Sequence, residues 1–322
     1  MRIIRFIKNW TLPIAMLMGV ILYFVYVNIP FLAPTKPYVL RAVDFIQPIL
    51  IFSMLFLSFC KVSVGQIRPC KWHAWLLLIQ GGSFVLLAVP LFLFPDMPGR
   101  ILIEGAMICL ICPTATAAAV VTQKLNGNAA RLISYTVLIN MVTAFLVPLV
   151  VPVIHPQEGM SFMTSFSMIL GKVFPLLLFP FVAAVLLRYL APKAHTFITQ
   201  FKDLAFYLWA VALTLAIAVT VRSIVHSHYS LWFQLGLALV SLLTCALQFF
   251  VGKKIGSGYG DTISAGQAMG QKNTVLAIWM GITFFTPVTA VAAGFYSVWH
   301  NVVNSYQLYH QRMKEEGGGS DK

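Results

Sequence analysis

Ten apolar stretches follow one another along this chain, and each is about as long as a helix that crosses a lipid bilayer. Lipid offers no hydrogen-bond partners to a backbone, so each stretch is predicted to be an α-helix. The expected fold class is an all-α membrane protein with ten transmembrane helices. The predicted spans are residues 10–29, 39–60, 73–94, 100–124, 129–154, 171–190, 202–222, 229–252, 262–285 and 286–308.

The composition excludes a soluble globular protein, because 59% of the residues are hydrophobic and only 10% are charged. The net charge of +13 does not indicate nucleic acid binding, since the 22 Lys and Arg residues are scattered between the apolar spans. The five cysteines lie in or beside the spans and predict no extracellular disulfide framework. His-Glu-x-x-His and Gly-x-Ser-x-Gly motifs are absent, so neither an enzyme nor a metal site or cofactor is expected.

The basic residues indicate how the chain is oriented in the membrane. With ten spans both termini lie on one side, and the loops and termini of that side hold 16 Lys and Arg residues against five on the other. Because basic residues concentrate in cytoplasmic loops, both termini are predicted to be cytoplasmic in a multi-pass protein of a bacterial inner membrane. The N-terminal apolar run resembles a signal peptide but has no cleavage site, so it is interpreted as the first span.

The ten spans divide into two halves of five, residues 1–160 and 161–311, followed by a tail, 312–322, that is expected to be disordered. Since five is an odd number, the two halves have opposite orientations in the membrane. The chain is therefore predicted to contain an inverted repeat of five helices, an arrangement that is common in secondary transporters.

Spans four and nine are interrupted at equivalent depths. Pro113 follows Trp10 by 103 residues, and Asn273 follows Gly171 by 102. Paired interruptions in two inverted halves indicate a transport site near the middle of the membrane.

The two interruptions predict half-helices. Pro113 removes one backbone hydrogen bond from span four, and the second half of that span is predicted to begin near Thr114 or Thr116, either of which can cap it. The second half of span nine is predicted to begin at Asn273 or Thr274. Two helix N-termini that meet at the midplane favour an anionic group.

Three motifs in the same order resemble those of a known family. Cys112-Pro-Thr-Ala-Thr-Ala-Ala-Ala119, with Gly127-Asn128 beyond it, is similar to Cys-Pro-Gly-Gly-Thr-Ala-Ser-Asn followed by Gly-Asn. Gly270-Gln-Lys-Asn-Thr-Val-Leu-Ala277 is similar to Gly-Met-Gln-Asn-Ser-Gly-Leu-Ala, and Ser297-Val-Trp-His-Asn301 matches Ser-Val-Trp-His-Asn. These are motifs of the bile acid:sodium symporter family, and the resemblance covers nearly the whole chain.

The resemblance implies a carrier that moves an organic anion by alternating access. It implies a core domain of spans 3–5 and 8–10, in which helices four and nine cross at their interruptions. This core would move against a panel domain of spans 1, 2, 6 and 7. The expected partners are a small or amphipathic anion of bile-acid, sterol or carboxylate type and the lipid bilayer, without nucleic acid. Neither the individual substrate nor the oligomeric state follows from the sequence.

The chain departs from the family at the first sodium site. That site uses the Ser-Asn after the Thr-Ala of helix four and hydroxyls of helix five. The matching positions here are Ala118, Ala119, Leu132 and Thr136, so only one of them carries a side-chain oxygen.

The second sodium site of the family uses a Glu and a Gln on helix nine. These fall on Ala268 and Lys272, although a one-residue slip brings Gln267 under the Glu, and Gln271 adds a further carboxamide. Lys272 thus places a positive charge where the family binds a cation. Sodium is therefore not expected as a cofactor, and Lys272, Gln267, Gln271 and Thr136 are the candidates for coupling or for replacing the ion.

A lysine at bilayer depth is costly and usually faces a protein interior. One hypothesis is that the Lys272 ammonium replaces sodium, bridges the broken helix to carbonyls of helix four, and couples transport to protons, because burial disfavours the charged form of a lysine. A second is a permanently charged strut in a sodium-independent uniporter or exchanger. A third is an ion pair of Lys272 with Glu104 or Asp44.

Six residues are candidates for substrate contact: Thr114, Thr116, Asn273, Thr274, His300 and Asn301. The alternative for His300 and Asn301 is an interhelical hydrogen bond that holds span ten against the core. For the whole chain, the alternatives are a conventional sodium-coupled symporter, a non-transporting membrane receptor and a membrane-embedded enzyme.

Overall fold

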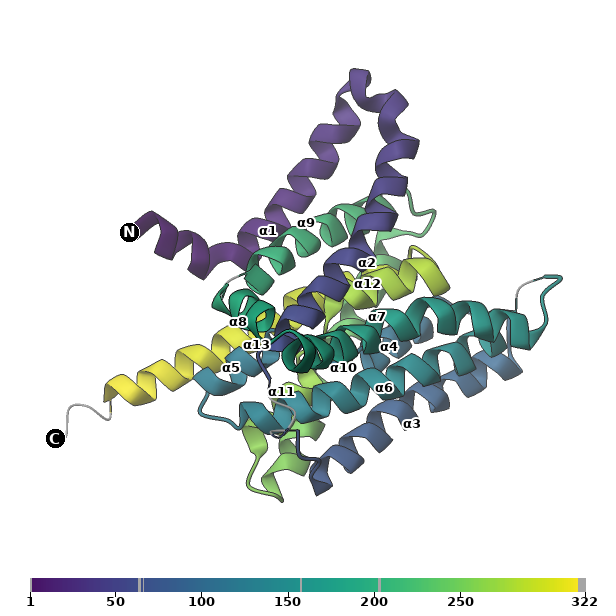
Figure 1. Ribbon diagram of the computed structural model, residues 1–322. Coiled ribbons are helices and arrows are strands. Elements are labelled where there is room, and N and C mark those ends of the chain that lie inside the picture. The colour runs from purple at the N-terminus through teal and green to yellow at the C-terminus, as the bar shows by residue number, and fades with distance from the viewer. Residues whose placement is uncertain (1, 63–64, 66, 157, 202–203, 318–322) are drawn as a thin grey trace.

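The computed structural model describes residues 2–62, 65, 67–156, 158–201 and 204–317, and this part of the chain is all-helical, without a β-strand (Figure 1). In chain order the elements are α1 (Arg2–Asn28), the 3-10 helix η1 (Pro30–Thr35), α2 (Lys36–Cys60), α3 (Lys71–Leu93), α4 (Arg100–Ile111), α5 (Ala118–Lys124), α6 (Ala129–Ile154), α7 (Phe162–Leu190), α8 (Pro192–Gln200), α9 (Leu204–Val225), α10 (Leu231–Ser257), α11 (Thr262–Gly270), α12 (Thr274–Phe284) and α13 (Thr289–Gly317).

Six helical stretches are long and apolar enough to cross a membrane: η1 with α2, then α3, α6, α7, α9 and α10. They coincide with six of the ten predicted spans. Three of the other four differ for physical reasons. Predicted spans four and nine are each split into two short helices, and α13 is polar over much of its length. For span one, the part of α1 whose side chains the structure describes is the apolar stretch Pro13–Asn28.

The interruption of span four falls where the sequence predicts it. α4 ends at Ile111, because Pro113 lacks an N–H and disfavours helical conformation in the residue before it. The N-cap of α5 is Ala117, which makes no side-chain hydrogen bond. The prediction that Thr114 or Thr116 caps this half-helix is therefore wrong. The non-helical segment between α4 and α5 is longer than Pro113 alone requires, so α5 begins further along the chain.

The interruption of span nine separates α11 from α12, and here the predicted cap is confirmed. The side chain of Asn273 accepts a hydrogen bond from the Leu276 N–H at 3.3 Å, at the N-terminus of α12. α11 ends at Gly270, where an added Cβ would lie 2.4 Å from the ring of Phe249. Only glycine lets α10 approach the interruption this closely.

Two boundaries differ from the predicted ones. α7 begins at Phe162 rather than at residue 171. α13 continues to Gly317, so residues 312–317 of the tail that was expected to be disordered are helical. Residues 318–322 lie outside the described residues.

The contacts between helices follow the same pattern in both halves. α1 packs along α9 and α2 along α7, as Figure 1 shows. α3 packs against α4 and α6, and α10 packs against α11 and α13. If α1 corresponds to α7 and α2 to α9, the contact of α1 with α9 is equivalent to that of α7 with α2. The contacts of α3 with α4 and α6 are then equivalent to those of α10 with α11 and α13.

α10 lies unusually close to α11 because glycines face the contact. A Cβ added at Gly252 would lie 2.5 Å from the carbonyl oxygen of Ala265, and one added at Gly256 would lie 2.6 Å from the Ala265 Cβ. Small residues at such contacts let two helix backbones approach closely, which is typical of helix packing in membranes.

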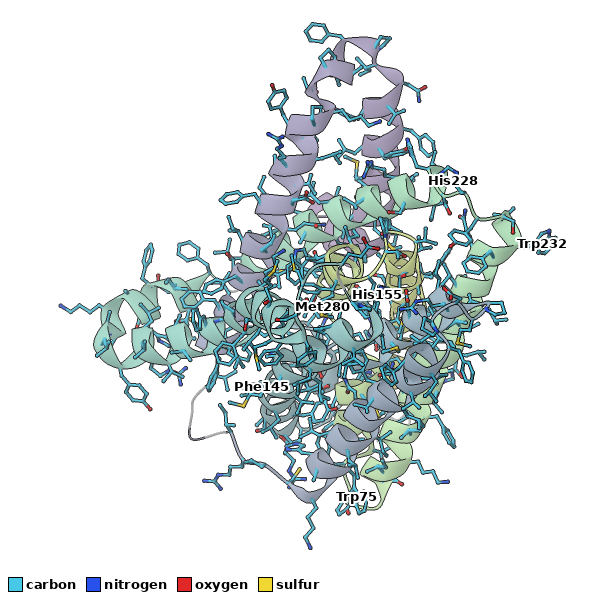
Figure 2. The ribbon with its side chains drawn as sticks, turned by 90° about the vertical axis from the view of Figure 1, so that its right-hand side faces the viewer. Trp75, Phe145, His155, His228, Trp232 and Met280 are labelled. Carbon is cyan, nitrogen blue, oxygen red and sulfur yellow. The ribbon has the colours of Figure 1, made fainter. Side chains whose placement is uncertain are left out.

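Large apolar side chains cover the outside of the molecule (Figure 2). Trp75 and Trp232, which are 52% and 82% exposed, lie at the bottom and at the right-hand side of the view in Figure 2. Such an apolar surface is suited to lipid.

Candidate functional site

The two interruptions lie side by side and pair with each other as a short antiparallel bridge. The Ala115 N–H donates to the Gln271 carbonyl at 2.8 Å, and the Asn273 N–H donates to the Pro113 carbonyl at 2.9 Å. Backbone groups that leave a helix inside a membrane must find partners within the protein. Here each broken helix supplies them to the other, and this fixes the crossing of spans four and nine.

The last carbonyls of α4, at residues 109–112, each accept a hydrogen bond from a side chain of another element. Gln248 of α10 donates to the carbonyl of residue 109 at 3.1 Å, and the Lys272 ammonium donates to that of residue 110 at 3.2 Å. Gln80 of α3 and Thr143 of α6 donate to residue 111 at 3.2 and 3.0 Å, and Gln80 also donates to residue 112 at 3.0 Å. The freed end of α4 is therefore completely paired.

Lys272 occupies the place that the sequence assigns to it, where it bridges the broken span nine to a carbonyl of span four. Its side chain is only 1% exposed. The C-terminal end of a helix carries a partial negative charge, so the end of α4 is an electrostatically suitable site for a cation. Among the described residues no carboxylate pairs with Lys272, and its Nζ bonds to the Leu110 carbonyl.

The proposed pairing of Lys272 with an acid is wrong for Glu104. The Glu104 carboxylate, 1% exposed, accepts from the Arg100 Nε at 2.7 Å, and its other oxygen accepts from Thr289 at 3.0 Å. The His155 Nε2 lies 3.0 Å from it. Asp44, the other acid considered, is exposed, whereas Lys272 is buried. Glu104 and these three residues form a separate, partly buried cluster at the N-terminal end of α4.

The positions that match the first sodium site lie in apolar surroundings. Ala118 and Leu132 are 0 to 1% exposed and belong to one hydrophobic cluster, with Ala119 packed against it. Ala268, which matches the glutamate of the second site, belongs to the same cluster. The Thr136 hydroxyl donates to the Leu132 carbonyl of its own helix at 3.0 Å. This arrangement offers a cation no converging oxygen atoms among those side chains.

The carboxamides near the second sodium site differ in their partners. Gln267 is 1% exposed and turns toward α13, where its Nε2 donates to Asn304 at 3.0 Å and to Gln307 at 3.2 Å. The Gln271 side chain is buried, and its Oε1 has no hydrogen-bond partner among the described residues.

The candidate substrate residues gather around the crossing, but several are engaged in internal bonds. Thr114 donates to the Ala268 carbonyl at 2.6 Å, and Thr274 donates to the Ser297 hydroxyl at 3.2 Å. Thr116 is half-buried beside them.

The two candidates on α13 have different roles. The Lys272 N–H donates to the His300 Nδ1 at 3.3 Å, so His300 forms the interhelical bond that was considered as its alternative. Asn301 donates to the Ser297 carbonyl of its own helix at 2.6 Å.

Asn273 is the remaining candidate. It caps α12 at the interruption of span nine and is 6% exposed.

The hydrogen bonds of Thr136 and Thr114 predict different effects when the two hydroxyls are removed. Thr136→Val should leave uptake and thermal stability nearly unchanged, because the hydroxyl bonds only to its own helix. Thr114→Val removes a bond between α11 and the crossing, which should cost about 1 kcal/mol of stability and lower uptake. Thermal unfolding and uptake in proteoliposomes measure both variants side by side. An equal loss in the two would mean that Thr136 takes part in an ion site.

Comparison with known proteins decides the family. The model of the Sodium Bile acid symporter family matches residues 48–227, more than half of the 322-residue chain. The chain belongs to this family. It is also 22% identical over 232 residues, 70% of this chain and 69% of the relative, to the uncharacterized sodium-dependent transporter YocS of Bacillus subtilis (strain 168).

Family membership and the apolar helices together make this chain a multi-pass membrane transporter with a small-molecule substrate. Proteins of this family are transporters rather than enzymes. The crossing of the interrupted helices is the part of the transporter in which the motifs, the buried lysine and the paired backbone ends coincide.

Two glutamine–tyrosine pairs at the crossing are functional candidates that the sequence reasoning missed. Gln248 donates to the Tyr296 hydroxyl at 3.0 Å, which in turn donates to the Gly270 carbonyl at 2.8 Å. In the other half, the Tyr135 hydroxyl donates to Gln80 at 2.7 Å. A glutamine within an apolar span is a usable signal. So is the spacing of the tyrosines, because Tyr296 follows Tyr135 by 161 residues, as Gly171 follows Trp10.

Proposed function

We propose that this transporter carries a small or amphipathic organic anion by alternating access, without sodium, and that Lys272 takes the place of the cation. The observation that carries the proposal is the bond from the Lys272 ammonium to the Leu110 carbonyl at the end of α4. A positive charge there would perform two tasks that we assign to sodium in sodium-binding members of the family. It neutralises the helix end, and it raises the local potential for an anion.

The proposal includes ten spans in two inverted repeats, residues 1–160 and 161–311. Its support is the equal order of helices in the two halves, with α4–α5 and α11–α12 as the interrupted spans. The contacts α1–α9 and α2–α7, and α3–α6 and α10–α13, are equivalent under this repeat. A core of spans 3–5 and 8–10 then moves against a panel of spans 1, 2, 6 and 7, with both termini in the cytoplasm of a bacterial cell.

In the proposed mechanism the anion approaches the crossing from the side of the half-helix N-termini. The Asn273 side chain and the N-terminus of α12 supply hydrogen-bond donors, with Thr116 beside them. His300 holds α13 in place around the site, whereas Asn301 bonds within α13. Thr114 and Thr274 act by holding the crossing together, because their hydroxyls are bonded within the protein.

The coupling of the proposed carrier depends on the proton of Lys272. If the ammonium stays charged through the cycle, the protein is a uniporter or an exchanger. If it releases its proton in one state, transport is coupled to the proton gradient. Uptake into proteoliposomes with and without a pH gradient separates the two forms.

The second candidate is a conventional sodium-coupled symporter, and the name of the Bacillus relative favours it, since that protein is described as sodium-dependent. Against it stand the apolar surroundings of Ala118, Leu132 and Ala268 and the buried ammonium of Lys272. Sodium would have to bind within a few ångströms of a like charge, which is unfavourable in a low dielectric.

The sodium dependence of the purified protein tests this proposal. Replacing sodium by choline at constant ionic strength should leave the Tm and the binding of organic anions unchanged. A sodium-stabilised protein in which Lys272→Gln has no effect would contradict the proposal. A screen of organic acids and bile acids by thermal shift, with wild type and Lys272→Ala in parallel, should identify the substrate class as the ligands that stabilise only the wild type.

A further inference from the structure

The short helix α8 lies where three longer helices end. α2 ends at Cys60, α7 ends at Leu190 and α9 begins at Leu204. The Arg188 guanidinium donates to the Cys60 carbonyl at 2.9 Å, and the His195 Nε2 lies 2.8 Å from the same oxygen. The Arg188 bond joins the end of α7 to the end of α2, and the His195 contact ties α8 to the same point, where the spans end.

α8 is too short and too polar to cross a bilayer, but it is amphipathic. Its nine residues reach about half-way across the hydrocarbon core at most. Phe197 is 59% exposed and Phe201, just after the helix, is 47% exposed, with their ring centroids 5.2 Å apart. An amphipathic helix with exposed aromatic residues and little overall hydrophobicity is suited to the membrane–water boundary.

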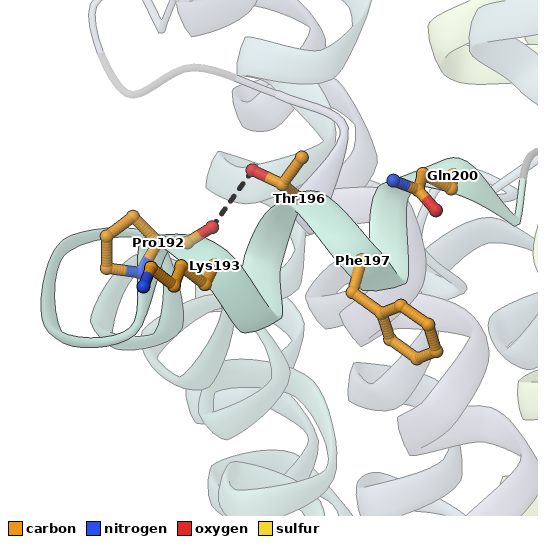
Figure 3. Close-up of a pocket in the computed structure, with 5 residues that line it drawn as sticks. All are labelled: Pro192, Lys193, Thr196, Phe197 and Gln200. Carbon is orange, nitrogen blue, oxygen red and sulfur yellow. Dashed lines mark hydrogen bonds between the residues drawn. The ribbon is translucent and has the colours of Figure 1, made fainter.

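A groove of about 380 Å³ runs along the exposed face of α8 (Figure 3). Lys193, Thr196 and Gln200 line it at spacings of three and four residues, with Phe197 at its edge. Thr196 donates to the Pro192 carbonyl at 2.9 Å, so its oxygen is available as an acceptor. The groove therefore offers one ammonium, one carboxamide and one hydroxyl oxygen next to an apolar side chain.

The charged residues on α8 and at the end of α7 are basic. Arg188, Lys193 and His195 are basic or able to become so, and the sequence from Arg188 to Phe201 contains no Asp or Glu. No acidic residue of this segment competes for Lys193. The complementary group is an anion that also has an apolar part, which is the chemistry of an anionic phospholipid.

We propose that α8 lies in the membrane–water boundary and binds an anionic phospholipid, with its phosphate on Lys193 and its acyl chains beside Phe197 and Phe201. Gln200 and Thr196 hydrogen-bond the rest of the headgroup. The site is distinct from the crossing of α4 and α11. It requires neither a particular substrate nor a particular coupling ion.

Lipid titration of the delipidated protein tests the proposal. Phosphatidylglycerol and phosphatidylcholine are added to the purified transporter in detergent, and bound lipid is counted by native mass spectrometry. Wild type should bind phosphatidylglycerol more tightly than phosphatidylcholine. Lys193→Gln should weaken phosphatidylglycerol binding about five-fold, which is the contribution expected of one basic residue near an anionic lipid. Phe197→Ser should weaken the binding of both lipids.

Lys36→Gln is the matched control, because Lys36 is exposed at the other end of α2 and should not change lipid binding. Equal binding of the two lipids by wild type, or an unchanged affinity in Lys193→Gln, would overturn the proposal. Inorganic phosphate and glycerol phosphate should not displace the lipid. Displacement by either at low concentration would show a site for soluble phosphates instead, and would also overturn it.

Discussion

Lys272→Met should abolish most transport while leaving the protein folded. Methionine has nearly the same length, so it fills the same space beside Leu110 without the charge. Losing the charge-assisted hydrogen bond to the Leu110 carbonyl, and with it the positive potential that attracts the anion, should cost about 2–3 kcal/mol of substrate binding, or roughly 30- to 150-fold in affinity. Uptake and substrate binding in proteoliposomes measure the effect.

Thermal stability separates this role from a purely structural one. An ammonium that is 1% exposed and has no carboxylate partner among the described residues is expensive to bury, so its replacement by an apolar side chain should leave the Tm unchanged or raise it. Lys254→Met is the control, since Lys254 lies at the end of α10 and should leave uptake unchanged. Full transport in Lys272→Met would contradict the proposed function.

Glu104→Ala should cause the largest loss of stability of any substitution considered. The buried carboxylate bonds Arg100, His155 and Thr289, and it thereby ties α4 to the end of α6 and the start of α13. Removing one partner of a buried ion pair costs about 3–5 kcal/mol, because the other charge is left without compensation. Thermal unfolding in detergent should show a fall of many degrees, accompanied by loss of uptake.

Glu158→Ala is the matched control for this prediction. Glu158 lies in the exposed loop between α6 and α7, so its removal should not change the Tm. Glu104→Gln keeps the shape of the side chain and should fall between wild type and Glu104→Ala. A Glu104→Ala protein with the Tm of wild type would mean that the cluster at the end of α4 contributes nothing to stability.

The interruptions could be predicted because their causes are local. Pro113 ends α4 by its own chemistry, and Asn273 is a residue type that caps helices, so both features follow from sequence alone. The length of the first interruption does not. The paired bonds between the two interruptions hold residues 112–117 out of the helix, and these bonds come from a segment about 160 residues further along the chain.

The partners of the buried polar groups also required the tertiary structure. Gln267 faces Asn304 and Gln307 rather than the former sodium site, and Lys272 bonds Leu110 rather than Glu104. Each outcome depends on how a helix is rotated about its axis, and packing against neighbours sets that rotation. The close contact of α10 with α11 at Gly252 is one of the contacts that set this rotation.

The sequence by itself determined that this chain crosses a membrane, where six of its spans and the two interruptions lie and which family it resembles, because apolar length, proline and short motifs act locally. Only the tertiary structure decided which atoms meet at the crossing. Carbonyls that Pro113 frees from α4 can be satisfied by any nearby donor. Side chains of α3, α6 and α10, together with Lys272, supply those donors only once the helices are packed together.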